Sequence, residues 1–217
     1  MKQEQNKRNF VMQRLIGQWS ARRSQSNPTS VTVRPLQPDD ASLIYAMHGR
    51  LSPESIYYRY LQHRPPTLDA IATLYRLDPA TGAGFVATVQ QQDEIIVGVA
   101  CYVRETYTEP PTAELGILVE DRFQGQGVGR RLWQRIQRHA QTHQIHQLRV
   151  LVHPGNQRMQ RLLRGSGLSY TTSTCDGVHE YLVALDLRSH SALPHPVPAE
   201  TTPIEIGPSP RDQLAWY

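Results

Sequence analysis

One segment restricts the fold more than any other, the stretch Glu114–Arg130. It begins as a mostly apolar run of strand character, and three glycines follow at alternate positions, Gly125, Gly127 and Gly129. The next residues, Val128–Thr142, place apolar side chains at helical spacing. Glycines allow tight turns, and successive N–H groups at a helix N-terminus bind anions. The segment therefore predicts a strand–loop–helix unit with a phosphate or pyrophosphate ligand.

The spacing of these glycines argues against two common phosphate-binding motifs. A P-loop needs Gly-Lys-Ser/Thr, and no lysine occurs in the segment. A dinucleotide-binding fold needs Gly-x-Gly-x-x-Gly and an acidic residue about 20 positions further on. The spacing here differs, and the strands before it resemble an antiparallel meander. Taken alone, the loop is also compatible with a plain tight turn.

Strand and helix patterns continue on both sides of this segment. Asp39 and Asp40 are candidate caps for a helix that runs to Gly49, and Ser52 with Pro53 is typical of the start of another. A third helix is expected at Leu68–Leu77 and a fourth at Asn156–Gly165. We expect strands at Val31–Leu36, Gly84–Gln90, Ile95–Arg104, Thr112–Glu120, Gln147–Val152, Tyr170–Thr174 and Tyr181–Leu187. This order predicts an α/β (α+β) domain over residues 31–188 around a mixed, mostly antiparallel sheet.

The two ends of the chain differ from the domain in composition. Residues 1–30 hold six of the 23 basic residues and one of the 19 acidic residues, and both lysines lie there. We expect a basic arm that is flexible or forms an amphipathic helix, and a disordered, proline-rich tail at 189–217. Nucleic-acid binding through the arm is a weaker alternative. No apolar run is long enough to span a membrane, and the two cysteines form no disulfide framework, so a cytoplasmic location is expected.

The glycine segment with its context resembles the GNAT family of N-acetyltransferases. The resemblance rests on Gln124-x-x-Gly127-x-Gly129, on Val33–Leu36, and on Asn156 at the start of a later helix. It implies a sheet whose two central strands splay apart and a cofactor, acetyl-CoA, with no metal. It implies that the pantetheine arm lies along Ile117, Leu118 and Val119, that Asn156 helps to hold the cofactor, and that Arg130 lies near its phosphates. The pyrophosphate would lie on the N–H groups of Gln124, Gly125, Gln126, Gly127, Val128 and Gly129.

Glu114 is the candidate catalytic residue. An amine acceptor is an ammonium ion at neutral pH, with a pKa of about 10.4 for lysine, so a base must take a proton before the nitrogen can attack. Strand alternation places Glu114 on the same face as Gly116, and we expect the glycine to leave room for an incoming side chain. The alternative is a plain exposed acid. Glu120 and Asp121 are interpreted as surface acids at the end of the strand.

A second resemblance concerns the acceptor. The stretch Leu51–Tyr60 and the residues around Glu114 are similar to bacterial protein lysine acetyltransferases, whose glutamate is the general base. This favours protein lysine as the acceptor amine. A small-amine acetyltransferase and a non-catalytic CoA-binding module remain alternatives, and the oligomeric state is not predicted. The chain lacks the large synthetase-like domain and the cyclic-nucleotide module of such enzymes, and lacks a tyrosine general acid after Asn156.

Other candidate residues have simpler explanations. His139 and His143 have zinc-ligand spacing but no evident third ligand, so we expect a solvated helix face. Cys101 is expected in the core. The role of Arg59 is open, because it could orient the acceptor loop or pair with an acid.

Overall fold

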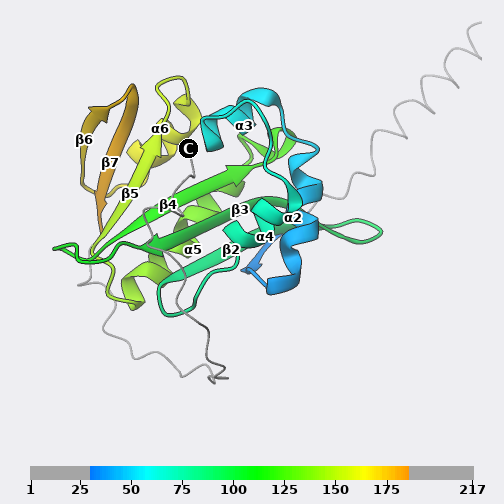
Figure 1. Cartoon of the computed structure of the whole chain (residues 1–217), viewed down its shortest axis with the longest axis horizontal. Coiled ribbons are helices and arrows are strands. Elements are labelled where there is room, and N and C mark those ends of the chain that lie inside the picture. The colour runs from blue at the N-terminus through cyan, green and yellow to red at the C-terminus, as the bar shows by residue number, and fades with distance from the viewer. Residues whose placement is uncertain (1–29, 186–217) are drawn as a thin grey trace, which may run out of the picture. The chain divides into compact units, whose positions relative to one another are not determined.

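The computed structural model describes residues 30–185, and Figure 1 shows them as one seven-stranded sheet with helices on both faces. The strands lie in the order β1-β2-β3-β4-β5-β7-β6. Their bounds are β1 Val31–Pro35, β2 Gly82–Gln90, β3 Glu94–Arg104, β4 Thr112–Val119, β5 Gln147–Val152, β6 Tyr170–Cys175 and β7 Val178–Ala184. The α-helices are α2 Ala41–His48, α3 Pro53–Tyr60, α4 Leu68–Leu74, α5 Val128–Thr142 and α6 Gln157–Arg164, with short 3-10 turns η1 Pro38–Asp40 and η2 Asp121–Phe123.

The predicted mixed sheet is confirmed, and so is its splayed centre. Every neighbouring pair is antiparallel except β4 and β5, which are parallel. These two strands pair over three residues only, from Thr112 opposite Gln147 to Glu114 opposite Arg149. Beyond Glu114 the residues of β4 have no partner on β5. The sheet therefore opens into a gap between β4 and β5, and Glu114 lies where the strands part.

Two apolar clusters hold the helices on the sheet. On one face, α5 buries Leu132, Trp133 and Ile136. On the other face, α2 and α4 bury Ile44 and Ile71, and Figure 1 shows these two helices in front of β2 and β3. Each fully buried side chain of this size contributes about 1.5–3 kcal/mol relative to exposure. The central strands are thus fixed from both sides.

Most helix boundaries agree with the sequence, and two details differ. Ser52 caps α3 through a hydrogen bond from the Ser55 N–H, as predicted. Helix α4 ends at Leu74, three residues before the predicted end. Asp40 was expected to cap a helix, but its side chain makes no capping bond to α2. It is buried instead, and its two oxygens accept hydrogen bonds from Arg34 at 2.7 Å each.

The ends of the chain bear on two further predictions. The expected basic arm and proline-rich tail lie outside the described residues, apart from Ser30. Within residues 30–185, no helix combines the length and the apolar character that crossing a membrane requires.

Candidate functional site

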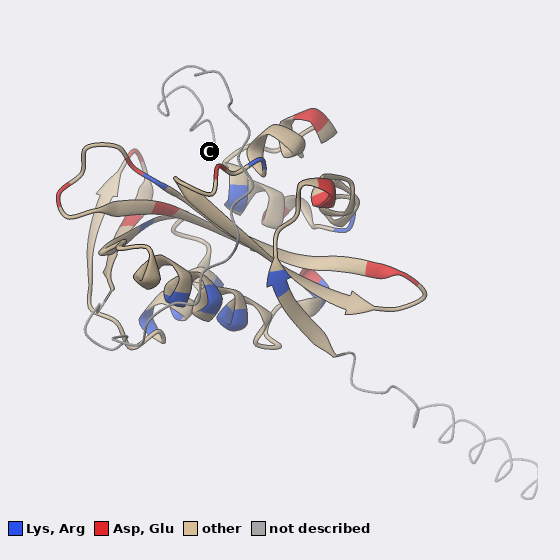
Figure 2. Cartoon of the chain, turned by 90° about the horizontal axis from the view of Figure 1, so that it is seen from below, with Lys and Arg blue, Asp and Glu red and all other residues tan. Residues whose placement is uncertain are grey.

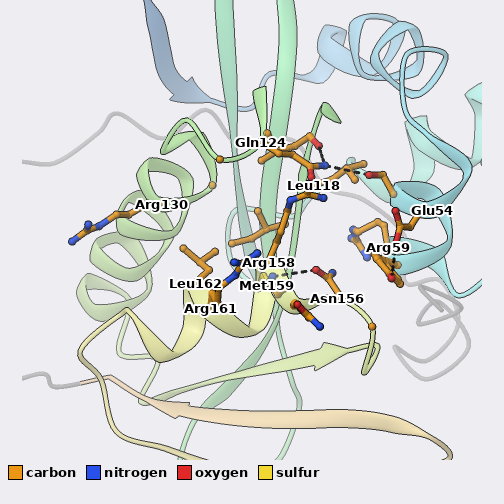
Figure 3. A pocket seen from close by; sticks show the side chains of 18 of the residues that line it. Glu54, Arg59, Leu118, Gln124, Arg130, Asn156, Arg158, Met159, Arg161 and Leu162 are labelled. Atoms are coloured by element: carbon orange, nitrogen blue, oxygen red, sulfur yellow. Dashed lines mark hydrogen bonds between the residues drawn. The ribbon is translucent and has the colours of Figure 1, made fainter. Parts of the chain in front are cut away.

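A cavity of about 670 Å³ lies at the gap between β4 and β5. That volume is within the range of about 300–1,000 Å³ that small-molecule and cofactor sites occupy. Figure 3 shows its walls, which come from the second half of β4, the glycine loop, the first turn of α5, helix α6 and helix α3. Nine of its lining residues were predicted from sequence: Ile117, Leu118, Val119, Gln124, Gly125, Gly127, Gly129, Arg130 and Asn156.

The glycine loop has the backbone conformation of an anion site. Gly125 and Gly127 have φ angles of 74° and 82°, in the left-handed region that favours glycine. Gly127 is the N-cap of the 15-residue helix α5 and supplies no capping side chain. The first N–H groups of α5 have no intrahelical acceptor, and the helix dipole favours negative charge at this end, where Gly127 and Gly129 line the cavity.

Gly129 serves a different purpose from the other two glycines. Its backbone is helical, and an added Cβ would lie 3.8 Å from Val119 and 3.9 Å from Leu162, which is ordinary contact distance. The protein itself thus has room for a side chain at this position. Because Gly129 lines the cavity, the glycine leaves space for a ligand rather than satisfying the fold.

The edge of β4 supplies the second backbone element of the site. Ile117, Leu118 and Val119 line the cavity and pair with β3 on one side only. A strand with one free edge can accept an extended ligand as an additional strand. The predicted contact of an extended ligand arm with Ile117–Val119 fits this geometry.

The signature side chain Gln124 contacts the protein. Its amide nitrogen donates to the Val119 carbonyl at 2.9 Å and to the Ser55 hydroxyl at 3.2 Å, as drawn in Figure 3. Gln124 thus ties the loop to the end of β4 and to α3. Gln126 turns away to the Arg122 carbonyl, Val128 is buried in the core, and neither lines the cavity. A cofactor contact through their N–H groups stays a prediction.

Helix α6 closes the cavity on the side of β5. The Asn156 oxygen accepts from the Met159 N–H and caps α6, so its NH₂ group is the half of the side chain that could donate to a ligand. The sequence analysis missed Arg158 and Arg161, which also line the cavity. Two arginines three residues apart after a capping asparagine were a usable signal. Arg130, which was predicted, is exposed and points outward from α5 in Figure 3.

The basic residues of α5 lie along its outer side (Figure 2), and Arg130 begins this row. Of this row only Arg130 lines the cavity, and together with Arg158 and Arg161 it places positive charge there. This charge suits the phosphates of a nucleotide-like ligand.

Glu114 lies in a second, smaller cavity of about 40 Å³ at the base of the gap. Residues on both splayed strands line it, together with Tyr58, Arg59 and His153. Glu114 does not line the large cavity, but the two cavities adjoin because five residues line both: Tyr58, Arg59, Ile117, Asn156 and Met159. These five residues form a shared wall between the two cavities, and Glu114 lies on the side of the small cavity.

The space beside Gly116 is filled, contrary to the sequence interpretation. We expected this glycine to leave room for an incoming side chain. An added Cβ at Gly116 would lie 2.7 Å from the Arg59 Cζ atom, because the Arg59 guanidinium packs on the glycine. Arg59, which belongs to α3, therefore fills the space beside Glu114 that we expected an acceptor side chain to enter.

The two acids at the end of β4 have structural roles. Glu120 is 1% exposed and forms ion pairs with Arg50, at 2.9 Å, and with Arg122. The prediction of a surface position was wrong for Glu120, because the sequence did not show that Arg50 of the α2–α3 connection would reach it.

Asp121 anchors the start of α3. Its carboxylate accepts hydrogen bonds from the Ser52 N–H, the Ser52 hydroxyl and the Ser55 hydroxyl at 2.7–2.8 Å. Burial alone would raise the pKa of Asp121, but the hydrogen bonds from Ser52 and Ser55 outweigh it, so the pKa lies below its ordinary value. Asp121 is half-buried, so its surface position is not contradicted, but the carboxylate also has a structural role that the sequence did not indicate.

The remaining candidates behave as structural residues. Cys101 is buried, and burial raises the pKa of its thiol to about 11, so it is no thiolate nucleophile. His139 accepts or donates a hydrogen bond with Tyr102 at 2.9 Å and stacks on His143. Among the described residues, no three His, Cys, Asp or Glu side chains are grouped to hold a metal ion.

Together these features are those of a protein that binds a long, phosphate-bearing ligand beside an acidic residue. The sheet opens beside a backbone anion site, its free strand edge can hold an extended arm, and an acid lies at the inner end of the gap. A long ligand with phosphates at one end and a reactive group at the other fits this arrangement.

Comparison with known proteins gives the family. The family model described as "Acetyltransferase (GNAT) domain" matches residues 30–169, and the chain therefore belongs to the GNAT acetyltransferase family. The solved GNAT domain of Streptomyces lividans PAT is similar, with 28% identity and a TM-score of 0.63 over 71% of this chain and 90% of that one.

More distant structures share the fold. For yncA of Salmonella typhimurium, solved with its cofactor acetyl-CoA, identity is 18% and the TM-score 0.58 over 76% of this chain and 98% of that one. An acetyltransferase of Thermus thermophilus has 21% identity and a TM-score of 0.56 over 72% of this chain and 97% of that one.

Proposed function

We propose that this protein transfers the acetyl group of acetyl-CoA to an amine nitrogen, in the main a lysine side chain of a protein, with Glu114 as general base. One observation carries the proposal. Glu114 lies where β4 and β5 part, and its small cavity adjoins the large one through the shared residues Arg59 and Ile117. An acid at the inner end of a cofactor-sized cleft can meet an amine that approaches from the α3 side.

The binding role falls mainly to the backbone. The N–H groups of the loop from Gln124 to Gly129 would hold the pyrophosphate, with Arg158 and Arg161 near the outer phosphate. The free edge of β4 would pair with the pantetheine amides. Acetyl-CoA supplies a thioester that an uncharged amine can attack. Ile117–Val119 would keep the acetyl end beside the shared wall.

The proton chemistry falls to Glu114. The acceptor arrives as an ammonium ion, and its carboxylate neighbour accepts the proton directly or through one water molecule. Such general-base catalysis contributes about 10²–10⁴ in rate, and placement of the two reactants contributes much of the rest. As the C–N bond forms, the C–S bond of the thioester breaks and CoA leaves as a thiolate; because a thiol has a pKa of about 8.5, this departure needs no proton, and no side chain is assigned as general acid.

Protein lysine as the acceptor rests on two likenesses. The stretch Leu51–Tyr60 is similar to bacterial protein lysine acetyltransferases, and the solved domain from Streptomyces lividans belongs to PAT, a protein acetyltransferase. A reaction that uses acetyl-CoA and cellular protein would place this chain in the cytoplasm, where unpaired cysteines such as Cys101 and Cys175 are usual.

The proposal is tested by measuring the release of CoA thiol from acetyl-CoA with two panels of acceptors. One panel holds acyl-CoA synthetases and other lysine-bearing proteins, and the other holds polyamines and small amines. The variant is Glu114→Gln, and Glu109→Gln is the matched control because Glu109 lies exposed in the β3–β4 loop.

We expect protein-dependent release that falls by about 10²–10⁴ in Glu114→Gln and stays unchanged in Glu109→Gln. Release with small amines alone would refute the lysine acceptor and favour a small-amine acetyltransferase. Binding of acetyl-CoA without release in either panel would refute transfer altogether and favour a CoA-binding module. Full activity of Glu114→Gln would refute the assignment of the base.

A further inference from the structure

Arg59 occupies an unusual position for a charged side chain. It comes from the last turn of α3, and it lines both the large cavity and the small cavity of Glu114 (Figure 3). It is therefore part of the wall between the cofactor cleft and the acid. Any amine that reaches Glu114 from the cleft must pass close to this guanidinium.

The contact with Gly116 fixes where the guanidinium lies. Strand alternation places Gly116 and Glu114 on the same face of β4, and the guanidinium packs directly on the glycine Cα. A Cβ at Gly116 would come within 2.7 Å of the Arg59 Cζ and closer still to its terminal nitrogen. Any side chain at position 116 would therefore displace the Arg59 guanidinium.

The surroundings keep Arg59 charged. Its guanidinium also lies over the Tyr60 ring, with the Cζ atom 5.2 Å from the ring centre. Burial lowers the pKa of Arg59, but the groups around it, which include the Glu114 carboxyl, leave the pKa above its ordinary value. A permanent cation therefore lies on Gly116, two residues from Glu114 on the same face of β4, and lines the same small cavity as Glu114.

We propose that Arg59 is a positioning residue for Glu114: it keeps the carboxylate ionised and directed into the gap between β4 and β5, and Gly116 provides its seat. This inference rests on the proposed function, because it concerns the base of that reaction. Arg59 makes no bond to the reacting atoms and acts through Glu114.

The other groups that face Glu114 do not fill this role. Arg149 lies opposite Glu114 in the register but pairs with Glu105 at 2.6 Å and also with Glu180. Cys101 of β3 is an uncharged thiol. His153, from the β5–α6 connection, accepts the Gly155 N–H at its Nδ1 atom, and Tyr58 donates to Glu54. Arg59 is therefore the cation that we assign to Glu114.

The first test is the pH dependence of kcat/KM in Arg59→Gln and Arg59→Lys. The acid limb of that profile reports the pKa of the base in the free enzyme. A neighbouring cation lowers the pKa of a carboxylate by about 1–3 units. We expect the acid limb to move to higher pH by about one unit or more in Arg59→Gln, and to stay near its wild-type place in Arg59→Lys.

The second test uses the Gly116 contact. Gly116→Ala must displace the guanidinium, so it should reproduce the shifted acid limb of Arg59→Gln. In an Arg59→Ala background, the clash is gone and Gly116→Ala should add little. Gly49→Ala is the control, since a Cβ there meets only the Ala46 carbonyl at 3.5 Å. The affinity for acetyl-CoA reports whether each variant is folded.

The outcomes separate this inference from the proposed function. An acid limb that stays in place in Arg59→Gln, while Glu114→Gln is inactive, would overturn the role of Arg59 and leave the base intact. Additive effects of Arg59→Ala and Gly116→Ala on the acid limb would contradict the claim that Gly116 acts by leaving space for the Arg59 guanidinium. Full activity of Glu114→Gln would instead overturn the proposed function itself. If Arg59→Gln fails to fold, Gly116→Ala alone decides the question, because it keeps Arg59 and displaces its guanidinium: an acid limb that stays in place would overturn the role of Arg59.

Discussion

The two sides of the cleft present different kinds of chemical group. On the side of the loop and α5, the cavity is faced mainly by backbone: two left-handed glycines, the N-terminus of a 15-residue helix and a free strand edge. On the side of α3, it is faced by charged and aromatic side chains such as Arg59 and Tyr58. We call these the cofactor side and the acceptor side.

This difference explains what each side can tolerate. A site made of N–H groups is insensitive to many side-chain changes but is sensitive to added atoms where glycine is required. A site made of a cation and an acid depends on the identity of both side chains, because charge and geometry both matter. The cofactor side should suit one ligand throughout a family, whereas the acceptor side can be altered residue by residue.

One group of hydrogen bonds joins the two sides. Gln124 of the loop donates to Ser55 of α3, and Asp121 before the loop accepts from both Ser52 and Ser55. The motif that resembles lysine acetyltransferases and the motif that resembles the whole family therefore form one structural unit. The serines of the first motif serve the position of α3, so they do not themselves select an acceptor.

The largest loss of stability is expected from Asp121→Ala, which removes the hydrogen bonds that join the two sides of the cleft. The change leaves the Ser52 N–H and two hydroxyls without their charged acceptor, and we expect a loss of about 2–4 kcal/mol in the free energy of unfolding. Denaturant unfolding measures it, with Asp93→Asn in the exposed β2–β3 turn as control. A loss as small as that of the control would contradict the anchoring role.

The same residue predicts a pH dependence. Because the pKa of Asp121 is lowered on folding, its stabilisation is present above the ordinary pKa and is lost as pH falls through the folded value. The difference in unfolding free energy between the wild type and Asp121→Asn should be constant from about pH 7 to 5 and should shrink below about pH 4. A difference that instead grows on acidification would contradict this sign.

Gly127 and Gly129 should differ in what a substitution affects: stability at Gly127 and acetyl-CoA binding at Gly129. Gly127→Ala forces a Cβ into a left-handed conformation and should cost about 1–2 kcal/mol in unfolding free energy. Gly129→Leu should leave that free energy unchanged or slightly higher, because leucine is the better helix former. It should nevertheless weaken acetyl-CoA binding tenfold or more, about 1.4 kcal/mol, by filling the cavity. Calorimetric titration and thermal unfolding of both variants check this, and full affinity in Gly129→Leu would place the ligand elsewhere.

The smallest effect is expected at Gln126. Its side chain turns to the Arg122 carbonyl and away from the cavity, so Gln126→Ala should change the affinity for acetyl-CoA by less than about twofold and the stability by less than about 0.5 kcal/mol. Equilibrium binding measures it. A large loss of affinity would show that side chains, rather than backbone N–H groups, supply the main contacts to acetyl-CoA.

Nine residues of the cavity wall were predicted from sequence because the pattern that marks them is local. Three glycines, a strand before them and a helix after them lie within one stretch, and α5 and β5 have the predicted bounds. The gap between β4 and β5 followed from the family resemblance, since the sequence alone does not show where two strands stop pairing.

The acceptor side was predicted less completely because its contacts join distant parts of the chain. Nothing near Gly116 indicates that Arg59, more than fifty positions earlier, would occupy its free space. Glu120 gave the pattern of a surface acid, and its partner Arg50 was not recognisable as such. Arg158 and Arg161 were missed for another reason: their spacing after Asn156 was a usable signal, but arginines on a helix more often only face solvent.

The most direct test of the division between the two sides is the equilibrium dissociation constant of acetyl-CoA for Glu114→Gln. Glu114 lies behind the shared wall and outside the cofactor cavity. We predict a dissociation constant within about twofold of the wild type, alongside a turnover number lower by about 10²–10⁴. A dissociation constant raised tenfold or more would contradict the account, because it would show that the acid belongs to the cofactor side.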